Sequence, residues 1–187
     1  MMRIISGSAR GTRLATLEGD ATRPTSERAK EAIFSMIQFD LEGREVLDLF
    51  GGSGQLSLEA LSRGAQGATV CDRSRQAVAI INQNAEKTKL KEKCRVICAD
   101  WSDALLRYER REKFDIVFLD PPYAERLIPK VLPRLLTVIK PTSIIVCESA
   151  EEDVFGKSGA QEKFEIIKQK KYGVAYVTLL KLKGENI

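Results

Sequence analysis

The sequence contains no histidine among its 187 residues. Histidine is the commonest metal ligand in proteins and the side chain that most often serves as a general base near neutral pH. Its absence counts against metal-dependent hydrolysis and against catalysis by a Ser-His or Cys-His pair. We therefore expect neither a metal site nor a histidine-based mechanism.

Cysteine is also scarce, and its four residues are Cys71, Cys94, Cys98 and Cys147. Cys94 and Cys98 are four residues apart, but zinc motifs combine such a pair with further Cys or His ligands. Each cysteine lies in or beside a run of β-branched residues, where a small apolar side chain is favoured. We therefore expect four reduced, buried thiols.

Long apolar runs are missing too. No stretch approaches the roughly 18 uninterrupted apolar residues that a membrane helix requires, and the first residues lack the apolar core of a signal peptide. These absences predict a cytoplasmic protein without a membrane partner. The net charge of +4, with a pI near 8.9, is only mildly basic. It permits a nucleic-acid partner without requiring one.

Strand and helix patterns alternate along most of the chain, which favours an α/β fold with a mainly parallel sheet. Apolar runs predict five successive strands, at residues 45–50, 68–71, 94–98, 114–119 and 143–147. Two further runs, at 164–169 and 174–182, are separated by a short link and predict an antiparallel hairpin. A parallel sheet that ends in such a hairpin is typical of class I, Rossmann-like S-adenosylmethionine-dependent methyltransferases.

The chain divides into a small N-terminal extension and a larger domain. Residues 1–40 are predicted to form an arm and a helix on the substrate side of the molecule, with Thr25 capping the helix. Residues 41–187 are predicted to form the Rossmann-like methyltransferase domain. Within it, Ser74 is expected to cap a helix, and Pro133 predicts either a kink or a late start in another.

A strand runs into a glycine-rich turn at residues 46–54, VLDLFGGSG. Glycine permits the tight turn and lets a ligand approach the backbone closely. The spacing is not that of a dinucleotide site, because Ser57 stands where the third glycine would be, and no phosphate-loop lysine follows. Asp48 precedes the glycines, and its carboxylate would repel a pyrophosphate but suit the ammonium group of an amino-acid-like ligand. These features favour S-adenosylmethionine over NAD.

Two more acids follow predicted strands. Asp72 ends the second strand, where an acid in a doubly wound fold accepts hydrogen bonds from ribose hydroxyls. Asp100 follows the third strand and can accept from an adenine amino group while Trp101 covers the ring; simple packing beside a helix start is the alternative for Trp101. The predicted cofactor-binding residues are Asp48, Phe50, Gly51, Gly52, Gly54, Asp72, Asp100 and Trp101.

The tetrapeptide Asp120-Pro121-Pro122-Tyr123 directly follows the fourth strand. Ligands of open α/β sheets bind outside the carboxyl ends of the strands. Prolines stiffen the loop and present carbonyl groups, so the Asp120 carboxylate and the Pro121 carbonyl can both accept from one amino group, and Tyr123 offers a face for stacking a base. No cysteine falls here to attack a pyrimidine ring. We predict that the four residues catalyse methylation of an exocyclic amino group on a base.

These motifs resemble the RsmD family of bacterial 16S rRNA guanine-N2 methyltransferases. Residues 22–34 are similar to the family's N-terminal signature and residues 46–65 to its cofactor motif. The resemblance implies methyl transfer from S-adenosylmethionine to N2 of a guanine, with 16S rRNA or the small ribosomal subunit as partner. Four residues depart from the usual pattern: Gly52 replaces Ala, Asp72 replaces Glu, and Ala29-Lys30 replaces Val-Arg. Lys in place of Arg weakens any bidentate phosphate contact.

The N-terminal segment fits an RNA partner independently of the resemblance. Residues 3–30 carry six basic residues against three acidic ones. Arginines beside a catalytic mouth suit phosphate contacts, so RNA contacts are predicted at Arg10, Arg13, Arg23 and Arg28. A solvated charged arm is the alternative.

Two other functions stay open on the sequence. A DNA adenine-N6 methyltransferase shares the tetrapeptide, although 187 residues leave little room for its target-recognition region. A non-catalytic ribosome-assembly factor could retain the fold, although the intact Asp120 counts against it. The sequence does not indicate an oligomeric state.

Overall fold

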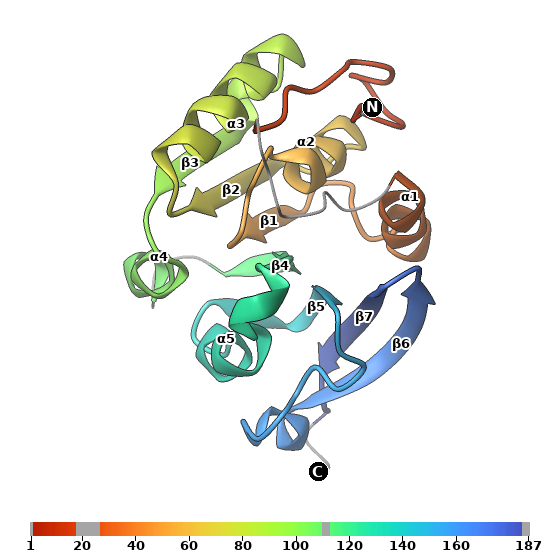
Figure 1. Ribbon diagram of the computed structural model, residues 1–187, viewed down its shortest axis with the longest axis vertical. Helices are drawn as coiled ribbons and strands as arrows, with labels where there is room; N and C mark the ends of the chain where they lie inside the picture. Colours follow the sequence, from red (N-terminus) through yellow and green to blue (C-terminus); the bar gives the residue numbers. More distant parts are fainter. Residues whose placement is uncertain (1, 18–26, 110–112, 185–187) are drawn as a thin grey trace.

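The computed structural model describes residues 2–17, 27–109 and 113–184. At its centre is a seven-stranded sheet in the order β3-β2-β1-β4-β5-β7-β6 (Figure 1). The strands are β1 (Glu45–Asp48), β2 (Gly67–Asp72), β3 (Cys94–Cys98), β4 (Phe114–Leu119), β5 (Ile139–Ser149), β6 (Phe164–Tyr172) and β7 (Ala175–Leu182).

Strands β1 to β5 pair in parallel, and β7 runs antiparallel to both β5 and β6. The central strand β4 is buried along its whole length, as expected for a parallel strand covered on both faces. The β6–β7 turn passes through Gly173, whose φ of 63° suits a tight hairpin turn. The predicted parallel sheet with a C-terminal hairpin is therefore confirmed.

Five of the seven strands differ in length from the prediction, among them β1 and β5. β1 ends at Asp48 instead of residue 50, because the Phe50 N–H donates to the Asp48 side chain and not to a neighbouring strand. β5 extends over Ile139–Ser149, well beyond the predicted residues 143–147, because it pairs with β4 on one side and β7 on the other.

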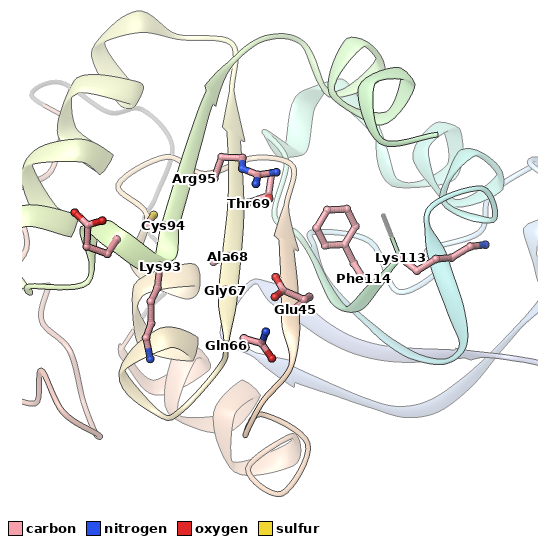
Figure 2. A pocket seen from close by; sticks show the side chains of 11 residues that line it. Glu45, Gln66, Gly67, Ala68, Thr69, Lys93, Cys94, Arg95, Lys113 and Phe114 are labelled. Carbon is pink, nitrogen blue, oxygen red and sulfur yellow. The ribbon is translucent and has the colours of Figure 1, made fainter. Parts of the chain in front are cut away.

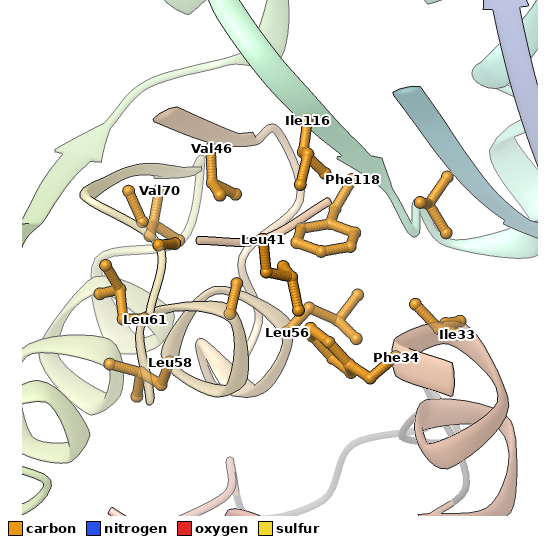
Figure 3. Close-up of a cluster of buried hydrophobic side chains, with 14 of the residues drawn as sticks. Ile33, Phe34, Leu41, Val46, Leu56, Leu58, Leu61, Val70, Ile116 and Phe118 are labelled. Atoms are coloured by element: carbon orange, nitrogen blue, oxygen red, sulfur yellow. The ribbon is translucent and has the colours of Figure 1, made fainter. Parts of the chain in front are cut away.

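In the described residues, five α-helices cover the two faces of the sheet (Figure 1). On one face, side chains from two helices and from β4 form a single apolar cluster (Figure 3). Phe34 and Leu58 come from the two helices, and Phe118 comes from β4. On the other face, Leu105 and Leu132 pack in a second cluster. The helices are α1 (Glu27–Met36), α2 (Gln55–Ser62) and α3 (Arg75–Lys87) on the first face, and α4 (Trp101–Tyr108) and α5 (Ile128–Leu135) on the second.

The predicted helix signals have mixed outcomes. The Ser74 hydroxyl accepts from the Ala77 N–H at 3.3 Å, so the predicted cap of α3 is confirmed. The predicted cap at Thr25 lies outside the described residues. A late start caused by Pro133 is wrong, because α5 begins at Ile128 and passes through Pro133.

The expectation of four buried thiols is wrong for Cys98. Cys71, Cys94 and Cys147 are buried, but Cys98 is exposed. The reason is its place as the last residue of β3, the edge strand of the sheet. In the described part of the chain, no helix is long and apolar enough to cross a membrane.

The first residues of the chain form an arm, residues 2–15, that is docked on α2. The carboxylate of Glu59 in α2 is fully buried and accepts from the N–H groups of Ile5 and Ser6 at 2.7 and 3.0 Å. Lys30 of α1, also buried, donates to the Arg3 carbonyl and lies 3.5 Å from Glu59. Lys30 therefore holds the arm in place, and its exposure of 1% leaves no surface for the phosphate contact considered from the sequence.

The turn of the arm and its last residue make different contacts. Gly7, in the turn of the arm, has a φ of +83°, and a Cβ added there would lie 1.8 Å from the carbonyl oxygen of Ser62, the last residue of α2. At the other end, Asn84 of α3 exchanges two hydrogen bonds with the backbone of Ala15 and donates to the carbonyl of Ser53 in the glycine loop at 2.8 Å. The buried amide of Asn84 thus ties the arm to the glycine loop, and the Ser53 hydroxyl adds a second contact by donating to the Met2 sulfur at 3.0 Å.

Candidate active site

Four predicted acids lie at the carboxyl edge, which we define as the edge of the sheet where the parallel strands β1 to β5 end. Asp48 and Asp72 are the last residues of β1 and β2, while Asp100 and Asp120 follow β3 and β4. Because β1 lies between β2 and β4, these strand ends are neighbours. The structure therefore brings the glycine loop and the tetrapeptide to one edge.

Asp48 lies beneath the glycine loop, with only 1% of its surface exposed. One carboxylate oxygen accepts from the Ser57 hydroxyl at 2.9 Å and the other from the Phe50 N–H at 3.3 Å. Burial, partly opposed by these hydrogen bonds, raises the pKa of Asp48 from 3.8 to about 7. Asp48 thus holds the loop between β1 and α2, and a cationic group nearby would favour its charged form. Ser57 was not predicted from the sequence as the partner of Asp48.

Asp72 connects the glycine loop to the start of α3. Its carboxylate accepts from the Gly52 N–H at 2.9 Å and from the Ser74 N–H at 2.8 Å. Both donors are backbone groups, so the contacts depend on the local chain path. Asp72 therefore holds the glycine loop in position, in addition to its predicted role of accepting hydrogen bonds from the ribose of the cofactor.

Glycine is required at the three predicted positions for different structural reasons. Gly52 and Gly54 adopt positive φ angles of 55° and 78°, which L side chains rarely adopt. A Cβ at Gly52 would meet nothing within 4 Å, so the loop backbone faces open space that suits a ligand. A Cβ at Gly51 would lie 2.5 Å from the Val70 side chain, so this glycine is required by packing against β2.

Asp100, Trp101 and Phe50 border the same edge. The Asp100 carboxylate caps α4 by accepting from the Ser102 N–H and hydroxyl at 2.9 and 2.8 Å. Trp101 begins α4, and both Trp101 and Phe50 are partly buried against the second core cluster. The packing role considered for Trp101 is therefore present.

The tetrapeptide leads from β4 into a short 3-10 helix, η2 (Tyr123–Glu125). Pro121 is buried, while Asp120, Pro122 and Tyr123 are half-buried. The Tyr123 hydroxyl donates to the Glu148 carboxylate at 2.8 Å, and Glu148 itself is 4% exposed near the end of β5. Glu148 was not predicted from the sequence, although an acid near the end of the fifth predicted strand is a signal of the same kind as Asp72 at the end of the second.

An ion pair joins two loops across the carboxyl edge. Arg73, directly after β2, donates to both carboxylate oxygens of Glu125, at 3.1 and 2.5 Å. Because β1 lies between β2 and β4, this pair spans the end of β1 and its glycine loop. Neither residue was predicted from the sequence.

The thiols are poorly suited to nucleophilic attack. Burial raises the pKa of Cys71 to about 12 and that of Cys94 to about 11, and it raises the pKa of Cys147 as well. A thiolate is the nucleophilic form of cysteine. These three cysteines are therefore protonated near neutral pH, which agrees with methylation at an amino group.

The predicted RNA-binding arginines lie on the N-terminal extension. Arg10 and Arg13 are exposed on the arm, and Arg28 is exposed in the first turn of α1. Arg23 lies outside the described residues. The turn that carries Arg10 is docked beside Ser62, at the end of α2 farther from the glycine loop.

A hollow lies at the amino edge of the sheet, where the parallel strands begin (Figure 2). Glu45 of β1, Gly67 of β2, Cys94 of β3 and Phe114 of β4 line it. None of the predicted site residues borders this hollow. Residues 2–17, 27–109 and 113–184 contain no group of three or more His, Cys, Asp or Glu side chains arranged to hold a metal ion.

Known proteins resemble this chain over nearly its whole length. The family model described as "conserved hypothetical protein 95" matches residues 2–181. A Bacillus subtilis protein named as a candidate rRNA methyltransferase, YlbH, is 35% identical, over 98% of this chain and 100% of its own. The ribosomal RNA small subunit methyltransferase D of Haemophilus influenzae is 31% identical, over 92% of this chain and 90% of its own.

Solved structures give the same result. A candidate methyltransferase from Escherichia coli, YhhF, superposes with a TM-score of 0.83 at 27% identity, over 98% of this chain and 99% of its own. Two more distant candidate methyltransferases share the fold, one of them named as S-adenosylmethionine-dependent and the other complexed with SAH. The predicted fold class and cofactor are therefore confirmed. The chain belongs to the RsmD family of methyltransferases, the family described as conserved hypothetical protein 95.

Proposed function

We propose that this protein transfers a methyl group from S-adenosylmethionine to the exocyclic N2 amino group of a guanine in bacterial 16S rRNA. The observation that carries the proposal is the position of Asp120-Pro121-Pro122-Tyr123 at the end of β4, one strand away from the glycine loop at the end of β1. The names of its relatives, which include ribosomal RNA small subunit methyltransferase D, support the choice of substrate. Such a substrate also supports a cytoplasmic location.

The carboxyl edge suits the cofactor chemically. The open space over Gly52 admits a ligand against the loop backbone, and the acids around the loop suit an ammonium group, ribose hydroxyls and an adenine amino group better than a pyrophosphate. We assign the holding of the cofactor to Asp48, Phe50, Gly51, Gly52, Gly54, Asp72, Asp100 and Trp101. When bound, S-adenosylmethionine supplies an electrophilic methyl group.

We assign the binding of the target guanine to the tetrapeptide. A conjugated amino nitrogen is a poor nucleophile, and acceptors aimed at its hydrogens favour the charge that develops as the methyl group arrives. The Asp120 carboxylate and the Pro121 carbonyl are the acceptors, and Asp120 takes up the released proton. Pro122 keeps the loop stiff, and Tyr123 stacks on the base. Most of the rate enhancement then comes from placement.

The N-terminal extension, residues 1–40, is proposed to lie on the RNA side of the methyltransferase domain, residues 41–187. Arg10, Arg13, Arg23 and Arg28 are proposed as phosphate contacts, which position an RNA without reading its sequence. Docking of the arm on α2 favours this role for Arg10 and Arg13, because arginines on a docked segment lose less conformational entropy when they bind.

The activity can be tested by mass spectrometry of 16S rRNA from a strain that lacks the gene, before and after the purified protein is added with S-adenosylmethionine. Loss and recovery of one N2-methylguanine is the expected result. Methylation of adenine in DNA, or of no nucleic acid at all, would contradict the proposal and favour one of the two alternatives left open by the sequence.

The role of Asp120 can be tested in the same assay. We predict that Asp120→Ala lowers turnover by about 100-fold or more, the scale for losing one positioned polar group, while the affinity for S-adenosylmethionine measured by calorimetry changes little. Arg134→Ala, an exposed change on α5 remote from the tetrapeptide, is the control. Wild-type turnover in Asp120→Ala would remove the tetrapeptide from the mechanism.

A further inference from the structure

The β6–β7 hairpin brings two lysines to the carboxyl edge of the sheet. Near the end of β5, Glu148 pairs with Val177 of β7, which in turn pairs with Lys170 of β6. Neighbouring strands lie about 4.8 Å apart, so the backbone of Lys170 is roughly 10 Å from that of Glu148, two strand spacings away. Glu148 holds the hydroxyl of Tyr123. The hairpin tip therefore stands beside the base-binding side of the candidate site.

Both lysines are exposed and ordered by aromatic rings. The Lys170 Nζ lies 5.8 Å from the centroid of the Tyr172 ring, and the Lys171 Nζ lies 4.9 Å from that of Tyr176. A cation over an aromatic face is attracted by the negative charge of that face. The two ammonium groups are thus held at the tip while they keep access to solvent.

The hairpin is strongly unbalanced in charge. Residues 164–182 contain four lysines and a single acidic residue, Glu165, which lies at the opposite end from the tip. The tip projects past the last paired residue of β5, Ser149, by the pair Tyr172–Ala175. This gives a positively charged ridge at the level where a nucleic acid with its base at Tyr123 would pass.

We propose that the tip of the hairpin, formed by Lys170, Lys171, Tyr172 and Tyr176, binds the backbone phosphates of the RNA that flank the base held at Tyr123. The inference rests on the proposed function, since it assumes an RNA substrate. Phosphate contacts fix the register and orientation of a nucleic acid. The hairpin thereby positions the target nucleotide at the tetrapeptide, and the N-terminal extension is not the sole RNA-binding surface.

An edge strand gives lysines a second explanation. β6 is the last strand of the sheet, and lysines on such a strand discourage pairing with another copy of the chain. The two explanations predict different losses. Removing phosphate contacts lowers RNA affinity and its dependence on salt, whereas removing edge protection causes self-association.

The test compares two double variants. Lys170→Ala/Lys171→Ala removes the tip charges, and Lys163→Ala/Lys183→Ala removes the same charge from two exposed lysines at the far end of the hairpin, where Lys183 N–H donates to the Lys163 carbonyl. Binding of an unmethylated 16S rRNA transcript is followed by fluorescence anisotropy over a KCl series. The tip variant should bind about threefold or more weakly at fixed salt, and its slope of log affinity against log salt should be smaller by about one per lysine. The control should match the wild type.

The outcomes separate this inference from the proposed function. If the wild type neither binds nor methylates the transcript, both the proposed function and the inference are overturned. If the wild type does both and the tip variant keeps its affinity and salt slope, only the inference is overturned. Self-association of the tip variant in sedimentation velocity, with unchanged RNA binding, overturns it in favour of edge protection. Calorimetry with S-adenosylmethionine, expected to be equal for all three proteins, shows that each is folded.

Discussion

At the scale of single residues, the aspartates at the carboxyl edge have different structural roles because their surroundings differ. Asp48 is buried under the glycine loop, Asp72 bridges that loop to α3, and Asp100 caps α4. Each of these carboxylates makes hydrogen bonds within the protein that hold a loop at the carboxyl edge. The cofactor site is therefore preorganised by the side chains that are proposed to bind the ligand.

The contact between Tyr123 and Glu148 predicts a positioning role for Glu148. Tyr123→Phe and Glu148→Ala each remove one hydrogen bond, whose usual net value of about 1 kcal/mol corresponds to roughly a fivefold loss. We expect this loss in kcat/KM for RNA, without a change in S-adenosylmethionine affinity. Glu148→Gln keeps an acceptor and should retain most of the activity.

A double-variant cycle checks this prediction. If the hydrogen bond is the relevant contact, Tyr123→Phe combined with Glu148→Ala should lose no more than either variant alone. Additive losses, or a change in cofactor affinity in Glu148→Ala, would mean that Glu148 acts by another route.

At the scale of elements, the arm is held by contacts from two helices. Glu59 and Ser62 of α2 bind its backbone along one side, and Asn84 of α3 binds its end and the glycine loop together. From the sequence, a solvated charged arm was the alternative to an RNA-binding one, yet Ile4 and Leu14 of the arm are buried in the first core cluster. The arm therefore contributes to the core as well as to the surface.

Two glycines of the arm provide a matched test of its docking. Gly7 and Gly11 share a φ of +83°, so alanine at either position has a strain cost of about 1–2 kcal/mol. Only at Gly7 would the new Cβ overlap the Ser62 carbonyl; at Gly11 it meets nothing within 4 Å. Gly7→Ala should therefore lose more unfolding free energy in urea than Gly11→Ala, and its arm should exchange amide hydrogens faster. Equal losses would show that docking of the turn on α2 adds little stability.

At the scale of the whole molecule, buried acids make stability depend on pH in opposite directions. Burial raises the pKa of Asp48 to about 7, so the folded state binds a proton that the unfolded chain releases above 3.8. This contribution lowers stability as pH rises from about 4 to about 7. For Asp115, burial is outweighed by hydrogen bonds from Lys140 and the Glu45 N–H, so its pKa is lowered. Its contribution is present above pH 3.8 and is lost as pH falls through the lowered pKa.

Asp48→Asn should therefore flatten the pH dependence of unfolding. Relative to the wild type, its free energy of unfolding should rise between pH 4 and 8 by up to about 4 kcal/mol, the value of a pKa shift of about three units. Asp115→Asn is the control of opposite sign, since its difference from the wild type should shrink only in more acidic solution. Denaturant unfolding at a series of pH values measures both. Parallel curves for Asp48→Asn and the wild type would show that the Asp48 carboxylate is not destabilised by burial.

Local patterns in the sequence determined the order of strands and helices, the hairpin at the end and the acids at the strand ends. Each of these depends on residues a few positions apart: apolar runs mark the strands, and Asp48, Asp72 and Asp120 stand immediately where strands end. Chain topology then places those ends at one edge, because parallel strands must share a direction. The glycine loop and the tetrapeptide could be predicted for this reason.

Only the tertiary structure decided which distant residues meet. Tyr123 and Glu148 are 25 residues apart, and Arg73 and Glu125 are 52 apart. The same holds for burial: Lys30 is enclosed because the arm folds over it, whereas Cys98, the last residue of the edge strand β3, is exposed. The role of a side chain in such contacts depends on the distant residues that pack against it. Local sequence patterns do not show which residues these are.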